Sequence, residues 1–181
     1  LQYRRAVRIF DAERAKTQAL FEQIGEIDAA QAILSYRHSL PLWTTPVFEE
    51  KLSIRAESLL HPLLTESDCV PNDAQIEANW LLTGSNASGK STFIKAVALN
   101  AILAQSIHTC TASRFVLCRA AVVTSMAARD DLSAGESYFV AEIKSMRRVV
   151  ALAGGAMPFY CFIDEVLKGT NTAERIAASC A

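Results

Sequence analysis

The sequence has little that would set it apart from an ordinary globular protein. Its 18 basic and 19 acidic residues leave a formal net charge of −1, which excludes a polybasic surface that holds nucleic acid by phosphate contacts alone. The five cysteines are odd in number and form no C-x-x-C pair, which argues against a disulfide framework and against a zinc site. This cysteine usage is typical of a reducing compartment, so we expect a cytoplasmic protein.

A long hydrophobic run is also missing. The longest apolar stretch, 149–163, is interrupted by Gly154, Gly155 and Pro158, whereas a membrane-spanning helix needs about 20 apolar residues. We therefore expect no membrane contact in this segment. The chain is 51% hydrophobic, which is too apolar for a disordered protein and enough for a buried core. Because it begins and ends inside helical patterns, we expect it to be a piece of a longer protein.

The first 38 residues contain one glycine, Gly25. Their apolar side chains recur at spacings of three, four and seven, which predicts an amphipathic helix or a helix pair; the positions are Leu20, Ile24, Ile27 and Leu34. The first sixteen residues carry five basic and two acidic side chains. We interpret this excess as a solvated helix face, the alternative being contact with an acidic partner. Pro41 and Pro46 end the pattern, so we place a domain boundary near 39–47 and divide the chain into 1–45 and 46–181.

Strand and helix patterns alternate through the rest of the chain. We expect strands near 52–56, 78–83, 114–117, 121–125 and 159–163, and helices at 90–107, at 137–153 and from about 172. This alternation predicts an α/β fold with helices packed on a mostly parallel sheet, preceded by an N-terminal helical segment.

The segment 84–91 matches G-x-x-x-x-G-K-[ST], between the expected strand at 78–83 and the expected helix at 90–107. In such a phosphate loop (P-loop), glycines let backbone N–H groups turn toward phosphate oxygens, and the helix N-terminus adds its positive dipole end. Lys90 is expected to reach the β- and γ-phosphates, and Ser91 to coordinate Mg²⁺. The residues expected to bind the nucleotide are Gly84, Ser85, Asn86, Ala87, Ser88, Gly89, Lys90, Ser91 and Thr92. The alternative is a glycine-containing turn that happens to precede a helix.

Two carboxylates, Asp164 and Glu165, follow the apolar strand expected at 159–163. In P-loop enzymes an acid at this place holds the magnesium ion, so we expect Asp164 and Ser91 to be the metal ligands. Glu165 is expected to act as the general base that polarises the attacking water, with Lys90 as the second catalytic residue. The alternative is a buried strand that ends in an acidic surface turn.

Three blocks of the sequence together resemble the ATPase domain of the MutS-like DNA mismatch-repair proteins, which belong to the ABC-type ATPases. The first, 83–93, keeps the family's asparagine at Asn86. The second, 130–139, is similar to D-D-L-x-x-G-x-S-x-F, and the third, 164–172, to D-E-x-x-x-G-T-x-T. The resemblance covers the chain from about residue 76 to its end.

The same blocks leave a wider superfamily as the second interpretation. The segment 132–136 also looks like the L-S-G-G-Q element of transporter and SMC-type ATPases. Lys90 and Asp164 are too close in sequence to leave much room for the helical subdomain that transporter ATPases insert there, and Val166 stands where transporters commonly have proline. Ser133-x-x-Glu136 also reads as a capping box at the start of a helix, an interpretation compatible with either family.

The chain departs from the family pattern in ways that indicate a divergent branch. Ser85, Ala87 and Ser88 replace proline, methionine and glycine of G-P-N-M-G-G-K-S. The segment 60–63 lacks the arginine of the family's R-H-P element, and 69–72 has no aromatic residue where family members stack one on adenine. We therefore expect aliphatic contacts with the base and leave mismatch recognition open.

The resemblance implies Mg-dependent ATP binding and hydrolysis in a homodimer formed through the ATPase domain. Lys90 and Asn86 would contact the outer phosphates, and Ser137 would reach the γ-phosphate of the other subunit. Residues 1–45 would be the tail of a lever, and 46–181 an ATPase domain truncated at its C-terminal end. DNA would bind domains outside this chain, and hydrolysis would be expected of the longer protein rather than of the isolated segment. The alternatives are an ABC- or SMC-type ATPase, an ATP-gated clamp that reads no mismatches, and a P-loop kinase or GTPase.

Overall fold

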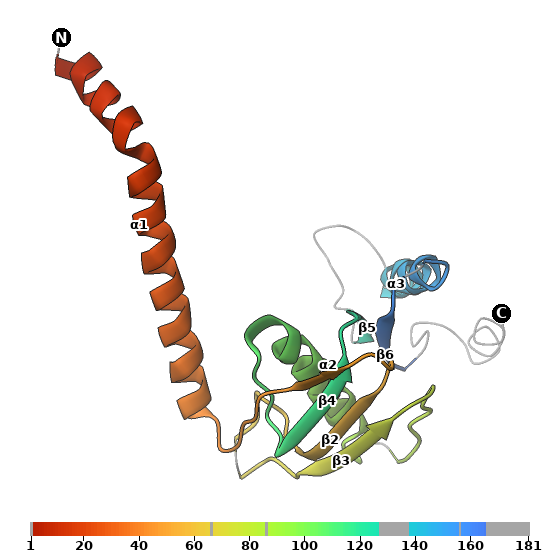
Figure 1. Ribbon diagram of the computed structural model, residues 1–181. Coiled ribbons are helices and arrows are strands. Elements are labelled where there is room, and N and C mark those ends of the chain that lie inside the picture. The colour runs from red at the N-terminus through yellow and green to blue at the C-terminus, as the bar shows by residue number, and fades with distance from the viewer. Residues whose placement is uncertain (1, 66, 86, 127–137, 156, 166–181) are drawn as a thin grey trace. The chain divides into compact units, whose positions relative to one another are not determined.

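The structure, a computed structural model, describes residues 2–65, 67–85, 87–126, 138–155 and 157–165 (Figure 1). The chain divides into two compact units, Leu1–Pro41 and Leu42–Ala181. That these units are a lever tail and an ATPase domain stays a prediction. Among the described residues, no helix combines the length and the apolar character needed to cross a membrane.

The first unit is built on one continuous helix, α1 (Gln2–Ser39), which confirms the predicted helical segment and decides between one helix and two. It ends where the Ser39 hydroxyl donates a hydrogen bond to the Tyr36 carbonyl at 2.7 Å. Several of its described larger apolar side chains are exposed, namely Leu20, Phe21, Ile24, Ile27 and Leu34. None of the side chains that the structure describes in this unit is buried.

The second unit contains a four-stranded sheet in the order β1-β4-β2-β3. Its strands are β1 (Val47–Glu49), β2 (Ile54–Leu59), β3 (Asn72–Ile76) and β4 (Arg114–Cys118). Only β1 and β4 are parallel, and β2 is antiparallel to both of its neighbours. The expectation of a mostly parallel sheet is therefore wrong here. The chain joins β2 to β3 without a crossover helix, and adjacent strands joined in that way run antiparallel.

A separate two-stranded sheet pairs β5 (Ala121–Met126) with β6 (Phe159–Asp164) in parallel. The helix α3 (Tyr138–Ala153) lies between them in sequence and packs on β5. This strand–helix–strand unit has the parallel pairing that the sequence predicts. The strands predicted at 121–125 and 159–163 are confirmed, each one residue longer, and the helix predicted at 137–153 is confirmed from Tyr138.

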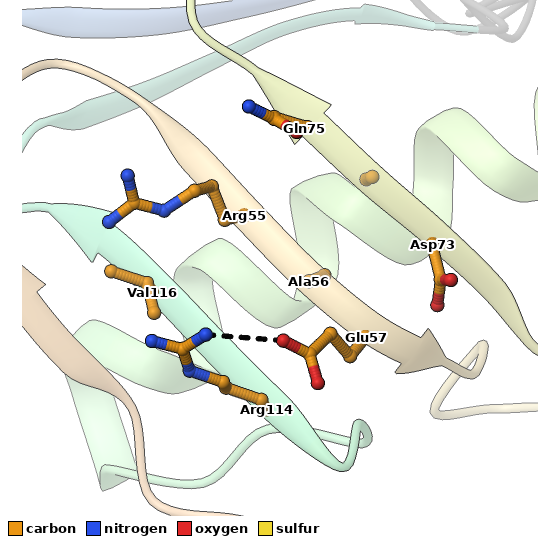
Figure 2. Close-up of a pocket in the computed structure, with 8 residues that line it drawn as sticks. Arg55, Ala56, Glu57, Asp73, Gln75, Arg114 and Val116 are labelled. Atoms are coloured by element: carbon orange, nitrogen blue, oxygen red, sulfur yellow. Dashed lines mark hydrogen bonds and ion pairs between the residues drawn. The ribbon is translucent and has the colours of Figure 1, made fainter.

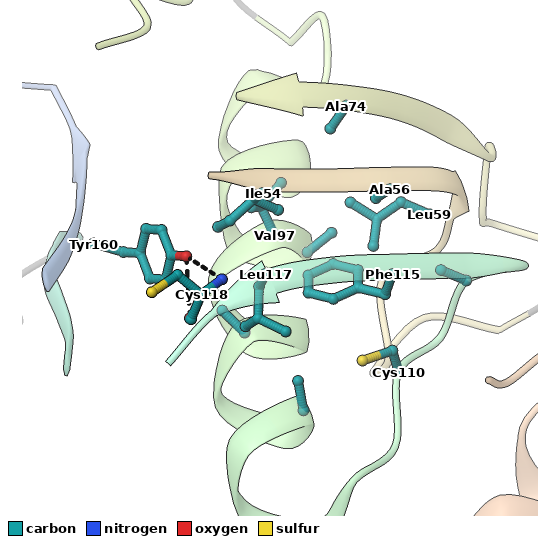
Figure 3. Packing of buried hydrophobic residues seen from close by; sticks show 14 residues of the cluster. Ile54, Ala56, Leu59, Ala74, Val97, Cys110, Phe115, Leu117, Cys118 and Tyr160 are labelled. Carbon is teal, nitrogen blue, oxygen red and sulfur yellow. Dashed lines mark hydrogen bonds between the residues drawn. The ribbon is translucent and has the colours of Figure 1, made fainter. Parts of the chain in front are cut away.

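The helix α2 (Lys90–Ile107), predicted with the same bounds, joins the two sheets into one core. It contacts both β5 and β6, and its small buried residues pack against the four-stranded sheet (Figure 3). The helix contributes Ala96, Val97, Ala101 and Ala104, and the sheet Ile54, Leu59, Phe115 and Leu117. Alanines on the helix let the backbones approach closely, so the larger sheet side chains fill the space between the layers.

The strand predicted at 78–83 is wrong. β3 ends at Ile76, and the following segment forms no ladder with a described strand. Its apolar side chains lie largely in solvent, with Leu81 90% and Trp80 51% exposed. An apolar run becomes a strand only where a neighbour completes its backbone hydrogen bonds, and the described sheets contain no such partner for it. The helix predicted from about 172 lies outside the described residues.

Candidate phosphate-binding site

The predicted phosphate loop leads directly into α2. Gly89 precedes the helix in the left-handed conformation, with φ of 87°, and its carbonyl accepts a hydrogen bond from Phe93 N–H at 2.9 Å. Glycine adopts this conformation without strain, whereas Ala87, with φ of 63°, adopts it at a cost. The loop closes on itself where Ser88 N–H donates to the Ser85 carbonyl at 3.3 Å. Two left-handed residues within three positions thus turn the chain sharply at the start of α2.

The Lys90 side chain folds back into this loop. Its ammonium group donates to the Gly84 carbonyl at 2.7 Å and to the Ser85 carbonyl at 2.5 Å. A Cβ atom at position 84 would lie 3.2 Å from the Ser88 hydroxyl and 3.7 Å from Lys90 Cδ. Glycine at 84 therefore leaves room chiefly for the Ser88 hydroxyl, and the loop holds one full positive charge against its own carbonyl groups.

The first turn of α2 adds further donors. The first backbone N–H groups of a helix have no intrahelical partner, and this turn contains neither an acidic residue nor a side-chain cap. No carboxylate of the turn itself therefore competes for the positive end of the helix. Ser91 is half-buried and Thr92 exposed in the same turn. The geometry suits an anion with several oxygens. Asn86 lies outside the described residues.

The two predicted carboxylates stand at the end of β6. Asp164 is half-buried and pairs in register with Met126 of β5, and Glu165 is exposed in the left-handed conformation, with φ of 58°. A glutamate in this conformation turns the chain abruptly off the strand. Because α2 contacts both β5 and β6, the helix that begins at the loop and the strand that ends in the carboxylates belong to one packed unit. Within the described part of the chain, no hydrogen bond or ion pair joins Asp164 to the loop.

The segment around His61 also packs near α2. His61 Nδ1 accepts a hydrogen bond from Leu63 N–H at 3.2 Å, and the Cys69 thiol donates to the His61 carbonyl at 3.6 Å. Burial, with a smaller contribution from the charge of Lys95 on α2, lowers the pKa of His61. Leu63 and Val70 are 77% and 74% exposed. This segment presents aliphatic side chains to solvent and no aromatic one.

Sequence reasoning missed Asn100, a fully buried amide in the middle of α2. Its Nδ2 donates to the carbonyls of Leu60 at 3.1 Å and Ala96 at 2.9 Å. Its Oδ1 accepts from Thr111 N–H at 2.6 Å and from the Thr111 hydroxyl at 3.0 Å. Asn100 thereby ties α2 to the start of the His61 segment and to the approach to β4. The signal was a lone polar residue inside an apolar helical stripe, because a buried amide is retained only with its hydrogen bonds satisfied.

A hollow of about 460 Å³ lies on the outer face of the four-stranded sheet (Figure 2). Its lining residues are Arg55, Ala56, Glu57, Asp73, Ala74, Gln75, Arg114 and Val116. Arg114 pairs with Glu57 at 3.2 Å, and Arg55 forms an ion pair with Glu49. The charges of this face are largely matched within the chain, and none of the predicted site residues lines the hollow.

Residues 130–137 of the second predicted block, Ser137 among them, lie outside the described residues, as does most of the third block. Lys90, Gly84, Ser85 and Ser88 are brought together, as a phosphate loop requires. The described residues contain no cluster of three or more His, Cys, Asp or Glu side chains suited to a metal ion. The phosphate loop and the end of β6 therefore contain all the predicted site residues that the structure describes.

A known protein family matches the part of the chain that contains the phosphate loop and the end of β6. The model of the family MutS domain V matches residues 80–181. The DNA mismatch repair protein MutS of Staphylococcus saprophyticus is 29% identical over 194 aligned positions, which cover 98% of this chain and 21% of that protein. The protein of the same name from Geobacillus thermodenitrificans is 33% identical over 170 positions, which cover 90% of this chain and 18% of that protein. The chain thus spans about a fifth of the length of these relatives.

Proposed function

Because the chain belongs to the MutS domain V family, we propose that it binds Mg·ATP and hydrolyses it, as the motor of a dimeric, DNA-associated protein of the mismatch-repair type. The observation that carries the proposal is the Lys90 ammonium group, drawn into a loop at the acid-free N-terminus of α2. A lysine beside a helix N-terminus is the combination with which a P-loop binds phosphates. The whole protein's activity and its DNA partner remain part of the proposal.

ATP binding follows from the donors of the loop. Lys90 would exchange its bonds to the Gly84 and Ser85 carbonyls for the β- and γ-phosphate oxygens, while backbone N–H groups at the helix start bind the remaining charge. Asn86 would contact the outer phosphates. The base would lie against aliphatic side chains of the His61 segment, of which Leu63 and Val70 are exposed.

The residues present fit Mg²⁺, which is usually held by one or two carboxylates together with substrate phosphates and water. Ser91 and Asp164 would be its protein ligands. When bound, the ion supplies charge neutralisation on the phosphates. Glu165 would take the proton of the attacking water, from a position where the chain turns off β6.

The resemblance adds a partner. Ser137 would complete the neighbouring subunit's site, so that the γ-phosphate holds the dimer closed and its loss opens it. A mixed dimer of Ser137→Ala and Lys90→Ala subunits contains one composite site with both defects and one intact site. It should therefore regain ATPase activity that each homodimer lacks. A Ser137→Ala homodimer with wild-type ATPase activity would show that Ser137 acts only as part of a helix cap.

The second candidate is an ABC- or SMC-type ATPase, or an ATP-gated clamp, that never reads mismatches. It is favoured by the unusual loop residues Ser85, Ala87 and Ser88. Binding of the full-length protein to mismatched and to matched DNA duplexes distinguishes the two. Equal affinity for both duplexes favours the clamp, and preference for the mismatch favours the repair function.

The proposed function is tested with Lys90→Ala. We expect the loss of most affinity for Mg·ATP, because the substitution removes the one full positive charge of the loop and leaves only backbone dipoles. Titration with a fluorescent ATP analogue measures this. Lys51→Ala is the matched control, since Lys51 is exposed in the connection between β1 and β2 and pairs with Glu77. A folded Lys90→Ala protein that binds like the control would refute the phosphate-loop function.

A further inference from the structure

The strand β6, which ends at Asp164 and is followed by Glu165, is anchored by a single buried side chain. Tyr160 is 8% exposed, and the other described residues of the strand are half-buried. Its hydroxyl lies 2.9 Å from the Ser53 carbonyl. It also lies 3.1 Å from the Cys118 carbonyl and accepts a hydrogen bond from Cys118 N–H at 2.9 Å (Figure 3). These partners stand just before β2 and at the end of β4. One hydroxyl therefore connects β6 to the four-stranded sheet.

This connection matters because the two sheets form separate backbone ladders. Within the described residues, the place of β6 relative to the four-stranded sheet depends on side-chain packing and on this hydroxyl. A phenol has one proton to donate and can accept at the same time, so it can satisfy one carbonyl and the Cys118 amide together. Burial raises the pKa of Tyr160, which maintains the donating form.

The partners of the hydroxyl are all main-chain groups, so the anchor fixes backbone to backbone. The four-stranded sheet also packs against α2, at whose start Lys90 and Ser91 lie. Contacts with the four-stranded sheet therefore position both the helix that begins at the loop and the strand that ends at Asp164. A shift of β6 along the sheet would move Asp164 relative to Ser91 without disturbing the loop itself.

We propose that Tyr160 is a positioning residue, whose hydroxyl holds β6 in the register that places Asp164 and Glu165 for chemistry at the phosphate loop. This inference rests on the function proposed above, in which Asp164 and Ser91 share Mg²⁺. Loss of the hydroxyl is expected to impair magnesium use and turnover, and to leave magnesium-free nucleotide binding at Lys90 intact.

The first experiment tests the anchor without nucleotide. Tyr160→Phe in the full-length protein keeps the ring and removes only the hydroxyl, and Tyr3→Phe, at a site 80% exposed on α1, is the control. Amide hydrogen exchange should become about tenfold faster at Cys118 and along β6, because one hydrogen bond of the Cys118 amide and the strand's anchor are lost. Exchange in α2 should not change. Unchanged exchange at Cys118 and β6 would overturn the inference.

The second experiment tests the consequence for catalysis. The Mg²⁺ concentration that gives half-maximal ATP turnover should rise about tenfold in Tyr160→Phe, the size of effect typical for groups that orient metal ligands. Affinity for a fluorescent ATP analogue in EDTA should stay at the wild-type value, and Tyr3→Phe should match wild type in both. If Tyr160→Phe and wild type have the same magnesium dependence, or if the variant also loses magnesium-free binding, Tyr160 only fills the core and does not position the carboxylates. A wild-type protein that binds no nucleotide would refute the proposed function instead, and the exchange data would still decide on the anchor.

Discussion

The two sheets of the second unit differ in how deeply they are buried. In β2 and β4 the side chains of Ile54, Phe115 and Leu117 are at most 1% exposed. In β5 every residue is half-buried or exposed, and in β6 only Tyr160 is buried. The first sheet therefore contributes most of the buried core, whereas the second leads to the two carboxylates proposed for catalysis. Functional groups commonly lie in the less stable part of a fold, because that part can respond to a ligand.

The largest effect on stability should come from Phe115→Ala in the four-stranded sheet. Removal of this fully buried ring leaves a cavity and should lower the free energy of unfolding by about 3–5 kcal/mol. Urea denaturation followed by circular dichroism measures it. Phe162→Ala, at a half-buried position of β6, should cost clearly less. Equal losses for the two would show that both sheets carry the core to the same degree.

Glu165→Gln should have the opposite effect: a large loss of activity with almost no change in stability. The amide keeps the shape of the side chain but cannot take the proton of water, so ATP turnover should fall by ~10²–10⁴-fold while nucleotide binding persists. The free energy of unfolding should change by less than about 0.5 kcal/mol, because the residue is exposed. Single-turnover kinetics of the full-length protein provide the measurement. A wild-type rate would assign Glu165 a structural role.

Asn100→Ala should weaken the junction between α2 and the four-stranded sheet. It leaves the Thr111 amide and the Leu60 carbonyl with fewer partners in a buried place, at a cost of about 1–3 kcal/mol of unfolding free energy. Gln105→Ala, on the same helix and half-buried, is the control and should cost less. Thermal denaturation compares them. If Gln105→Ala is the more damaging change, the Asn100 hydrogen bonds do not hold this junction.

The smallest effect concerns pH. Because the folded state lowers the pKa of His61, protonation opposes folding. The contribution of His61 to stability is therefore complete above its unfolded pKa of about 6.5 and is lost as the pH falls through the lower pKa of the folded state. Denaturation midpoints from pH 7.5 to 5 should show this loss, and His61→Gln should reduce it. If the denaturation midpoint changes with pH in the same way in both proteins, His61 is not the cause of the change.

Some elements could be read directly from the sequence because their signals are local. The bounds of α2 follow from Gly89 before a long apolar helical pattern, and the G-x-x-x-x-G-K-S motif identifies the loop residues with no knowledge of the sheet. The strands β1 and β3 were missed because one has three residues and the other, Asn72–Ile76, is mainly polar. The strand predicted at 78–83 failed for the converse reason, since its apolar run meets no pairing partner in the described structure.

The sequence by itself determined the three described helices, the phosphate-loop motif and the pair of carboxylates, since each depends on spacing between near neighbours in the chain. The tertiary structure alone decided the antiparallel order of the four-stranded sheet, the buried Asn100 hydrogen bonds and the anchoring of β6 by Tyr160. Apart from the Asn100 bond to Ala96, those features join residues 11 to 107 positions apart. Such pairings depend on which backbone and side-chain groups remain to be satisfied once the core has closed, and no local pattern encodes that choice.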